Sequence, residues 1–524
     1  MEPQAGGLAP AFGEQFKFRS ENGHAEANEV RAVPYEGECP MWQGIKHGVF
    51  VALFSAVLLF SVTTTTNAQI SLTTKTGTLA DGATYLIQVP SNWNGTLFLY
   101  SHGYVVPGSP NPAQNVGDPA TGAFLLANGF ALAGSSYAHT GWAIQEALVD
   151  QIQVLDLFDA DFGKPKQTIA WGHSLGGIIT AGLVQNNPGR FTAAQPMCGV
   201  LAGGVATWNA ALDAEFAFKT LLAPNSPLQL VNITNPTANL NLSEEILAAA
   251  QATPQGRARI ALASAFGDTP GWFTPLSPEP ARNDFASQEQ NQFLWDSEVD
   301  FPFVFAFRAE LEFRAGGNVS WNNDIDYGIQ LLLSPNLNEV WALYQEAGLS
   351  LFEDIETLNR AARIKANPSA VQYLEQNIIF NGEINIPVLT MHTTGDGLVI
   401  NENETAYRTI VDLAGNGNFL RQTFVSRAGH CAFTPAETIA AVGTLLTRVE
   451  TGHWPTVEAN VLNGEATALG PQLNIFVAGG AIVPTTPAFI DFISGPYPRP
   501  FDSLAAICPK GSNRGCPFAF FLQH

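Results

Sequence analysis

The chain has 524 residues, of which 46% are apolar and 13% charged, which excludes a disordered or fibrous protein and predicts a large buried core. Its formal net charge of −22 repels phosphate backbones and anionic membrane surfaces, so we expect no nucleic-acid partner. No CxxC or histidine-rich spacing predicts a metal site, and no glycine-rich dinucleotide or phosphate loop predicts a cofactor.

An uncharged apolar run at residues 48–62 follows Lys46 and precedes a polar stretch that ends at Ala68. The run is short for a membrane span, which needs about 20 apolar residues, and is typical of a signal peptide. Because a long polar stretch precedes it, we place the true start at Met41. Residues 1–68 are therefore interpreted as an N-terminal extension with a signal peptide. We expect a secreted protein, extracellular or periplasmic, with no stable membrane anchor after cleavage.

Short apolar runs alternate with helical stretches over residues 69–200, and the same pattern returns over 383–448. This alternation is typical of a mostly parallel sheet flanked by helices, the α/β class. The predicted strands are 96–101, 130–134, 167–171, 191–198, 386–392 and 420–425. The predicted helices of these two segments are 141–158, 175–185 and 435–448.

The segment 201–382 interrupts the sheet and is predicted to be mainly helical, with pieces at 244–251, 257–265, 283–312 and 340–359. An insertion that leaves a sheet and returns to it is most simply a lid over the carboxyl ends of the strands, where open α/β sheets bind ligands. Its aromatic residues are interpreted as core packing, with a substrate pocket as the alternative. Residues 449–524, rich in proline and glycine, are expected to form an irregular appendage.

The motif Gly172-His173-Ser174-Leu175-Gly176-Gly177 lies between the predicted strand 167–171 and the helix 175–185. A serine hydroxyl becomes a useful nucleophile on a tight strand-to-helix turn beside a base, and the flanking glycines leave room for that turn. Here the chain resembles the α/β-hydrolase superfamily, as a secreted serine esterase or lipase-like member with a large lid insertion. The resemblance makes Ser174 the nucleophile.

The resemblance also implies an acid and a histidine after later strands. Asp396 follows the strand 386–392, and His430 follows the strand 420–425, so the order is Ser, Asp, His, as this fold uses it. Asp396 would orient His430, and His430 would act as general base and acid. Glu402 or Glu404 could substitute for the acid, whereas three other histidines fit the order less well: His139, His392 and His453.

Two backbone N–H groups are expected to stabilise the oxyanion. The resemblance assigns one to Leu175, directly after the nucleophile, and the other to Tyr104, in the loop that follows the strand 96–101. Four cysteines remain after Ala68, an even count that suggests disulfides in an exported protein. Cys508 and Cys516 bracket a short loop and are the first predicted pair; Cys198 and Cys431 are the second, with two buried free thiols as the alternative.

Together these features predict a hydrolase that cleaves carboxylic esters, of small molecules or of a polymer, through an acyl-enzyme on Ser174. The alternative is a secreted serine peptidase of the aminopeptidase type. In that case a lid acid would hold the substrate ammonium, with candidates Glu310, Glu312, Asp324 and Asp326. A non-catalytic binding module is a third reading, which the complete set of triad candidates disfavours.

Overall fold

The computed structural model describes residues 71–323, 325–478, 481–502 and 505. The predicted signal peptide, the start at Met41, Asp324, and the Cys508 and Cys516 pair lie outside the described residues. Within the described ranges, no helix combines the length and the apolar character that a membrane crossing requires.

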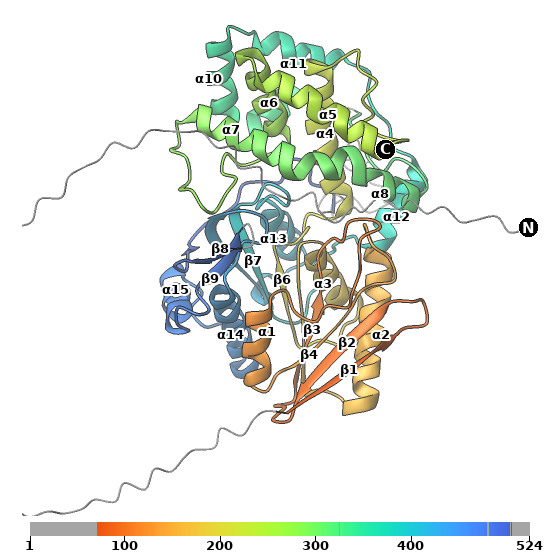
Figure 1. The fold of residues 1–524 in the computed structure, drawn as a ribbon, viewed down its shortest axis with the longest axis vertical. Coiled ribbons are helices and arrows are strands. Elements are labelled where there is room, and N and C mark those ends of the chain that lie inside the picture. Colours follow the sequence, from red (N-terminus) through yellow and green to blue (C-terminus); the bar gives the residue numbers. More distant parts are fainter. Residues whose placement is uncertain (1–70, 324, 479–480, 503–504, 506–524) are drawn as a thin grey trace, which may run out of the picture. The chain divides into compact units, whose positions relative to one another are not determined.

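A nine-stranded sheet forms the centre of the described chain, in the order β1-β2-β4-β3-β5-β6-β7-β8-β11 (Figure 1). The pairs that join β4, β3, β5, β6, β7 and β8 are all parallel, whereas β1, β2 and β11 pair antiparallel. The strands are β1 (Leu72–Thr78), β2 (Thr84–Pro90), β3 (Thr96–Ser101), β4 (Ala131–Ser135), β5 (Gln167–His173), β6 (Ala193–Met197), β7 (Val388–Gly395), β8 (Leu420–Ala428) and β11 (Phe489–Ile490). This mixed, mostly parallel sheet with flanking helices fits an α/β-hydrolase fold.

Helices cover both faces of the sheet, so its central strands are buried on both faces and rich in apolar residues. All six residues of β3 are buried, and alternate side chains enter different cores: Leu97 and Leu99 in one, Phe98 and Tyr100 in the other. The covering helices are α1 (Pro119–Ala127), α2 (Ile144–Phe162), α3 (Leu175–Asn186), α13 (Asn403–Leu413), α14 (Pro435–Thr451) and α15 (Ala459–Ala468).

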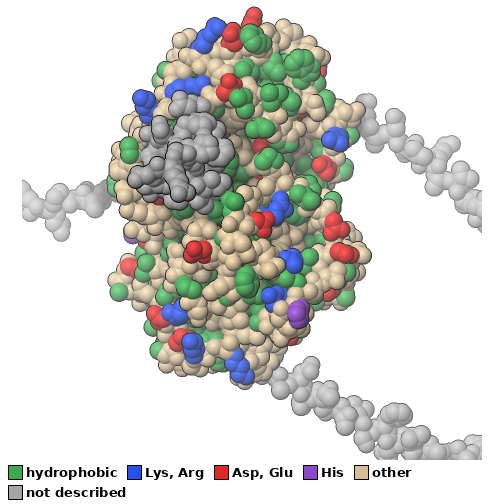
Figure 2. Space-filling view, turned by 180° about the vertical axis from the view of Figure 1, so that it is seen from behind, with side chains coloured by type: hydrophobic (Ala, Val, Ile, Leu, Met, Phe, Trp, Pro, Cys, Tyr) green, Lys and Arg blue, Asp and Glu red, His purple; other side chains and the backbone are tan. Residues whose placement is uncertain are grey.

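The chain between β6 and β7 is helical and has a hydrophobic core of its own, separate from the two cores of the sheet. Its helices are α4 (Gly204–Leu222), α5 (Pro236–Gln251), α6 (Pro254–Gly267), α7 (Phe285–Trp295), α8 (Arg308–Ala315), α9 (Tyr327–Leu333), α10 (Leu337–Ala347), α11 (Leu351–Arg360) and α12 (Pro368–Asn377). Hydrophobic side chains gather on the surface of this helical region, at the top of Figure 2.

Two of the long helices predicted in this region are interrupted. Between α7 and α8 the chain forms two π-helical turns, η1 (Asp296–Asp300) and η2 (Phe303–Phe307), so the predicted helix 283–312 is not continuous. The predicted helix 340–359 breaks at Gly348, which ends α10 with a φ of 66°. Glycine adopts this left-handed conformation without steric cost and commonly terminates helices.

The described part of the C-terminal segment contains more regular secondary structure than the predicted irregular appendage. It contributes α15, the small sheet of β9 (Ile475–Ala478) and β10 (Ala481–Pro484), and β11, which pairs with β8 at the edge of the main sheet. It then runs to the helical region, where Arg499 Nη1 lies 2.5 Å from Asp213 Oδ2 and Phe501 packs against Trp321. Pairing at a sheet edge has no sequence signature beyond a short apolar run, which explains the difference.

Candidate active site

Ser174 lies on the turn between β5 and α3, with φ 58° and ψ −123°. A residue other than glycine rarely adopts a positive φ, and such strain is typical of functional turns. The Ser174 N–H donates to the Met197 carbonyl at 3.0 Å, which ties the turn to β6. A methyl group on Gly176 would collide with the Ser101 carbonyl oxygen, so the close approach requires glycine there. The tight strand-to-helix turn expected from the sequence is therefore present.

Asp396 and His430, from the ends of β7 and β8, are brought together. Asp396 is fully buried, and its Oδ1 accepts the N–H groups of Leu398 at 3.1 Å and Val399 at 3.0 Å. Its Oδ2 lies 2.8 Å from His430 Nδ1. These contacts fix the carboxylate and orient the imidazole through its Nδ1 atom.

The serine turn lies within electrostatic reach of His430. Burial, and then the positive charge of His430, lowers the pKa of His173 to about 4. His173 is therefore neutral at neutral pH, and its Nδ1 lies 3.1 Å from the Tyr100 hydroxyl. His173 thus packs against the rings of Tyr100 and Phe433 beside the serine turn.

A disulfide joins Cys198 and Cys431, with their Cα atoms 5.4 Å apart. This bridge is the second pair predicted from the sequence. It links the loop after β6 to the loop after β8, and Cys431 Sγ lies 3.4 Å from His430 Nε2. Both cysteines have positive φ, 42° for Cys198 and 55° for Cys431. The covalent bond therefore restrains the loop that carries His430 in an uncommon backbone conformation.

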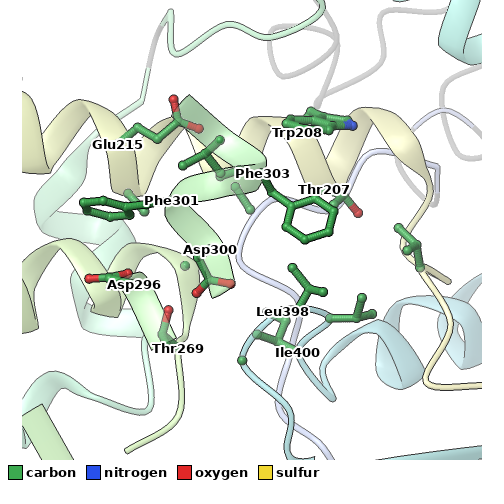
Figure 3. Close-up of a pocket in the computed structure, with 18 of the residues that line it drawn as sticks. Thr207, Trp208, Glu215, Thr269, Asp296, Asp300, Phe301, Phe303, Leu398 and Ile400 are labelled. Atoms are coloured by element: carbon green, nitrogen blue, oxygen red, sulfur yellow. The ribbon is translucent and has the colours of Figure 1, made fainter. Parts of the chain in front are cut away.

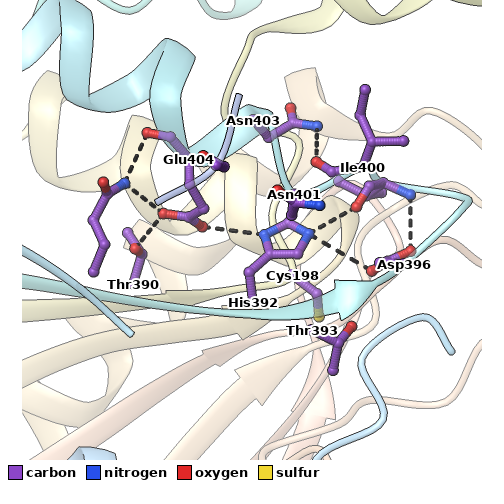
Figure 4. Close-up of polar contacts among 12 residues, drawn as sticks. Cys198, Thr390, His392, Thr393, Asp396, Ile400, Asn401, Asn403 and Glu404 are labelled. Atoms are coloured by element: carbon purple, nitrogen blue, oxygen red, sulfur yellow. Dashed lines mark hydrogen bonds and ion pairs between the residues drawn. The ribbon is translucent and has the colours of Figure 1, made fainter. Parts of the chain in front are cut away.

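A buried network lies behind Asp396 (Figure 4). His392 Nε2 is 3.7 Å from Asp396 Oδ2, and His392 Nδ1 is 3.1 Å from Glu404 Oε1. Glu404 also accepts hydrogen bonds from Thr390 and Gln422. Burial opposes the protonation of His392, but Glu404, Asp396 and the Val399 carbonyl outweigh it and raise the pKa of His392.

Glu404, a possible substitute for the acid on sequence grounds, and His392 therefore form a pair of their own. In the structure Glu404 contacts His392 rather than His430. The sequence held one signal for this pair. His392 lies within a predicted buried strand, and a buried polar side chain needs a hydrogen-bonding partner.

Tyr104 and Leu175 both line the same cavity as Ser174. Leu175 begins α3, where the first N–H groups of a helix have no partner within it. Tyr104 packs against Phe303 and Phe307, with ring centroids 5.0 and 6.0 Å apart. The loop before it is held by His102, which is buried, stacks on Tyr137, and lies 3.0 Å from the Ser136 carbonyl through Nε2.

The cavity has a volume of about 150 Å³ and lies between the strand ends and the helical region (Figure 3). The side of the sheet contributes Ser174 and the loop residues Leu398 and Ile400. The helical region contributes aromatic and acidic side chains, among them Trp208, Phe218, Phe301, Phe303, Glu215, Asp296 and Asp300. Tyr497 comes from the C-terminal segment. The three acids and Tyr497 lie in no sequence motif, so only the structure reveals their place in the cavity.

The acids suggested for a substrate ammonium are engaged elsewhere. Glu310 binds Arg314 and accepts the Trp142 N–H, Glu312 binds Arg308, and Asp326 caps α9. Asp324 lies outside the described residues. In the described part of the chain, no group of three histidine, cysteine or acidic residues is arranged to hold a metal ion.

Comparison with known proteins places the chain among hydrolases. No model of a known protein family matches it. Among solved structures, feruloyl esterase B from Aspergillus oryzae has a TM-score of 0.40 and 13% identity, covering 80% of this chain and 86% of the esterase. The rice cell wall degrading esterase LipA from Xanthomonas oryzae has a TM-score of 0.31 and 13% identity, covering 73% and 88%. Similarities at 13% identity and these TM-scores carry no information about the substrate of this chain.

A sequence relative is much nearer than these structures. The o-phthalyl amidase of Xanthobacter agilis is 30% identical over 451 residues, which cover 79% of this chain and 96% of the amidase. The alignment therefore spans nearly the whole relative, with the sheet and the helical region together. The chain belongs to the family of hydrolases that includes the o-phthalyl amidase of Xanthobacter agilis.

Proposed function

We propose that the protein is a secreted serine hydrolase that cleaves carboxylic ester and amide bonds through an acyl-enzyme on Ser174. The observation that carries the proposal is the buried Asp396 carboxylate, 2.8 Å from His430 Nδ1, at the end of the sheet where Ser174 occupies its strained turn. Acyl transfer needs a serine, a histidine and a buried acid, each from a different strand end.

In this mechanism Asp396 holds the proton of His430 on Nδ1, so Nε2 is the basic nitrogen. His430 takes the proton of the Ser174 hydroxyl as the serine attacks the carbonyl carbon, and then gives it to the leaving alcohol or amine. The backbone N–H groups of Leu175 and Tyr104 stabilise the negative charge on the carbonyl oxygen. Water, activated by His430, then releases the acid and restores Ser174.

The helical region 201–382 acts in this proposal as a lid that selects the substrate. It supplies most of the aromatic wall of the cavity, and the volume of about 150 Å³ fits a group the size of one benzene ring. The apolar run at 48–62 supports export, and so does the Cys198 and Cys431 disulfide, because disulfides persist in oxidising compartments.

An amide preference is the second candidate. The o-phthalyl amidase is named for an amide substrate, and this chain aligns with 96% of it. Its name also points to an aromatic acyl group, for which the apolar wall of the cavity is suited. The disulfide-restrained His430 loop would serve either leaving group, since the same histidine protonates an alcohol or an amine.

The test compares the para-nitrophenyl ester and the para-nitroanilide of one aromatic acid, with o-phthalyl amides as a third series. We expect turnover by the purified mature chain and its loss, by about 10⁴-fold or more, in Ser174→Ala. Ser287→Ala, at the first turn of α7, is the control and should be fully active. Equal activity of Ser174→Ala and the parent chain would overturn the proposal, and the ratio of anilide to ester rates decides between the two candidates.

A further inference from the structure

Three carboxyl groups face the cavity from the helical region: Glu215 from α4, and Asp296 and Asp300 from η1. Figure 3 shows them on one side of the cavity, with Leu398 and Ile400 on the other. Among the described residues that line the cavity there is no lysine, arginine or histidine. The acidic side of the cavity, defined by these three residues, therefore has no cation of its own in its wall.

Glu215 differs from the two aspartates in being almost fully buried. The residue is 3% exposed, and neither of its carboxyl oxygens has a hydrogen-bond partner in the described part of the chain. A buried polar group without a hydrogen bond is costly, so such groups in native structures call for an explanation. An unpaired acceptor in a cavity wall is a group that a ligand can satisfy.

Arg308 lies beside Glu215 but also pairs with a second carboxylate, that of Glu312. Its Nη1 lies 3.9 Å from Glu215 Oε1, beyond hydrogen-bond distance, while its Nε donates to Glu312 Oε1 at 3.0 Å and its Nη2 donates to Asn318 Oδ1 at 2.9 Å. Arg308 therefore serves two carboxylates with one positive charge. Glu215 therefore receives no hydrogen bond from Arg308.

The carboxyl group of Asp300 interacts electrostatically with two other acids, Asp296 in the same cavity wall and Asp396, the proposed catalytic acid. Burial raises the pKa of Asp300 well above its usual range, and the negative charges of Asp296 and Asp396 raise it further. Burial, followed by the charge of Glu289, raises the pKa of Asp296 to about 8. Burial likewise raises the pKa of Glu215, against the opposing effect of Arg308. All three groups would become more acidic on contact with a cation, since an opposite charge favours the ionised form.

The rest of the wall suits an organic cation rather than a bare ion. Aromatic rings surround the acids, including Trp208, Phe218, Phe301 and Phe303. The faces of aromatic rings attract cations, and their area favours an apolar group attached to the cation. A benzene-sized group with one ammonium substituent matches both the volume and the chemistry of the cavity.

From these observations we propose that the acidic side of the cavity binds a primary ammonium group carried by the aromatic or alkyl part of the substrate. The inference rests on the proposed hydrolase function and narrows its substrates to cationic esters and amides. The same carboxyls, if they remained protonated, would instead donate hydrogen bonds to an anionic substrate, and the experiment below separates these outcomes.

The first experiment compares para-nitrophenyl esters of two acids of equal size, para-aminomethylbenzoate and para-ethylbenzoate. We expect the parent chain to favour the ammonium compound in kcat/KM by about tenfold or more, because charge-assisted hydrogen bonds are strong in a desolvated site. Glu215→Gln should reduce this ratio by about fivefold or more. Glu353→Gln, an exposed acid on α11, is the matched control and should keep the full ratio.

A preference for the ethyl compound, or for an ester with a carboxylate in place of the ammonium, would overturn the inference. If neither ester is hydrolysed, the proposed function fails instead, and binding then decides the inference alone. For this purpose the affinities of benzylamine and benzyl alcohol for the full chain are measured by calorimetry. Tighter binding of benzylamine that is lost in Glu215→Gln supports the ammonium site, and equal affinities contradict it.

Discussion

The sheet region and the helical region place their functional side chains in different ways. In the sheet region Ser174, Asp396 and His430 each follow a strand, so parallel pairing alone carries them to one edge. In the helical region Glu215 lies within α4 and Asp300 within a π-helical turn, with no motif around either. In the proposed function, the sheet region therefore supplies the catalytic groups and the helical region selects the substrate.

The largest effect should come from the sheet region, in Asp396→Asn. The amide cannot hold the Nδ1 proton of His430 as a carboxylate does, so the imidazole adopts the wrong tautomer. We expect kcat to fall by about 10³- to 10⁴-fold while the fold persists, as measured by ester turnover and circular dichroism. Asp412→Asn, on the neighbouring helix α13, is the control. A loss below about tenfold would mean that Asp396 does not orient the base.

The next largest effect is expected on stability, in the variant Arg308→Met, which alters the core of the helical region. Arg308 is fully buried, binds Glu312 and Asn318, and lies over the Trp208 ring, 5.4 Å from its centroid. Its removal leaves buried carboxylates unpaired, so we expect a loss of about 3–5 kcal/mol in the free energy of unfolding, measured in urea.

The matched control is Arg360→Met, which removes an exposed ion pair with Glu356, spaced four residues apart like the pair of Arg308 and Glu312. Exposed pairs contribute about 0.5 kcal/mol or less. Similar losses in the two variants would contradict the view that the buried network holds the helical region together.

A third prediction concerns the link between two strand ends, the Cys198 and Cys431 disulfide. The double variant Cys198→Ala/Cys431→Ala should be less stable by about 2–4 kcal/mol, because the bridge closes a long loop. Hydrolysis should be lost at lower urea concentrations than tryptophan fluorescence changes, since the His430 loop is released first. The parent enzyme under reducing conditions should behave as the double variant does. If activity and tryptophan fluorescence change at the same urea concentration in these two samples, the early release of the His430 loop is contradicted.

The smallest effect is a pH dependence that arises in the helical region. Glu339 is buried, and burial, followed by the charge of Glu289, raises its pKa to about 8 while Gln292 opposes the shift. A carboxyl group whose pKa rises on folding binds its proton more tightly in the folded state. Its contribution to stability is therefore complete below the unfolded pKa of about 4.3 and is lost as the pH rises through about 8.

Glu339→Gln, which cannot titrate, should show a flatter decline of the unfolding temperature between pH 5 and pH 9. Glu346→Gln, on the same helix α10, is the control for a change of charge at the surface. An unchanged slope in Glu339→Gln would show that this carboxyl stays ionised in the folded protein.

Several features followed from local sequence. The strand before Ser174, the turn itself and the helix after it were predicted within a few residues, because an apolar run, a serine between glycines and an apolar helix are all local signals. The contact between Asp396 and His430 was expected from their order after successive strands, and the geometry is as expected at 2.8 Å. The Cys198 and Cys431 pairing was one of two possibilities, and proximity in space was needed to select it.

Other features depended on contacts between distant parts of the chain. Tyr497 reaches the cavity because β11 pairs with β8 and redirects the C-terminal segment toward the helices. Glu404, at the start of α13, contacts His392 and Thr390 of β7, and no sequence spacing predicts that contact. Thus the sequence by itself determined the strand-end chemistry, since periodicity and turn residues act over a few positions. Tertiary structure alone decided which acids line the cavity, since the packing of helices depends on side chains far apart in the chain.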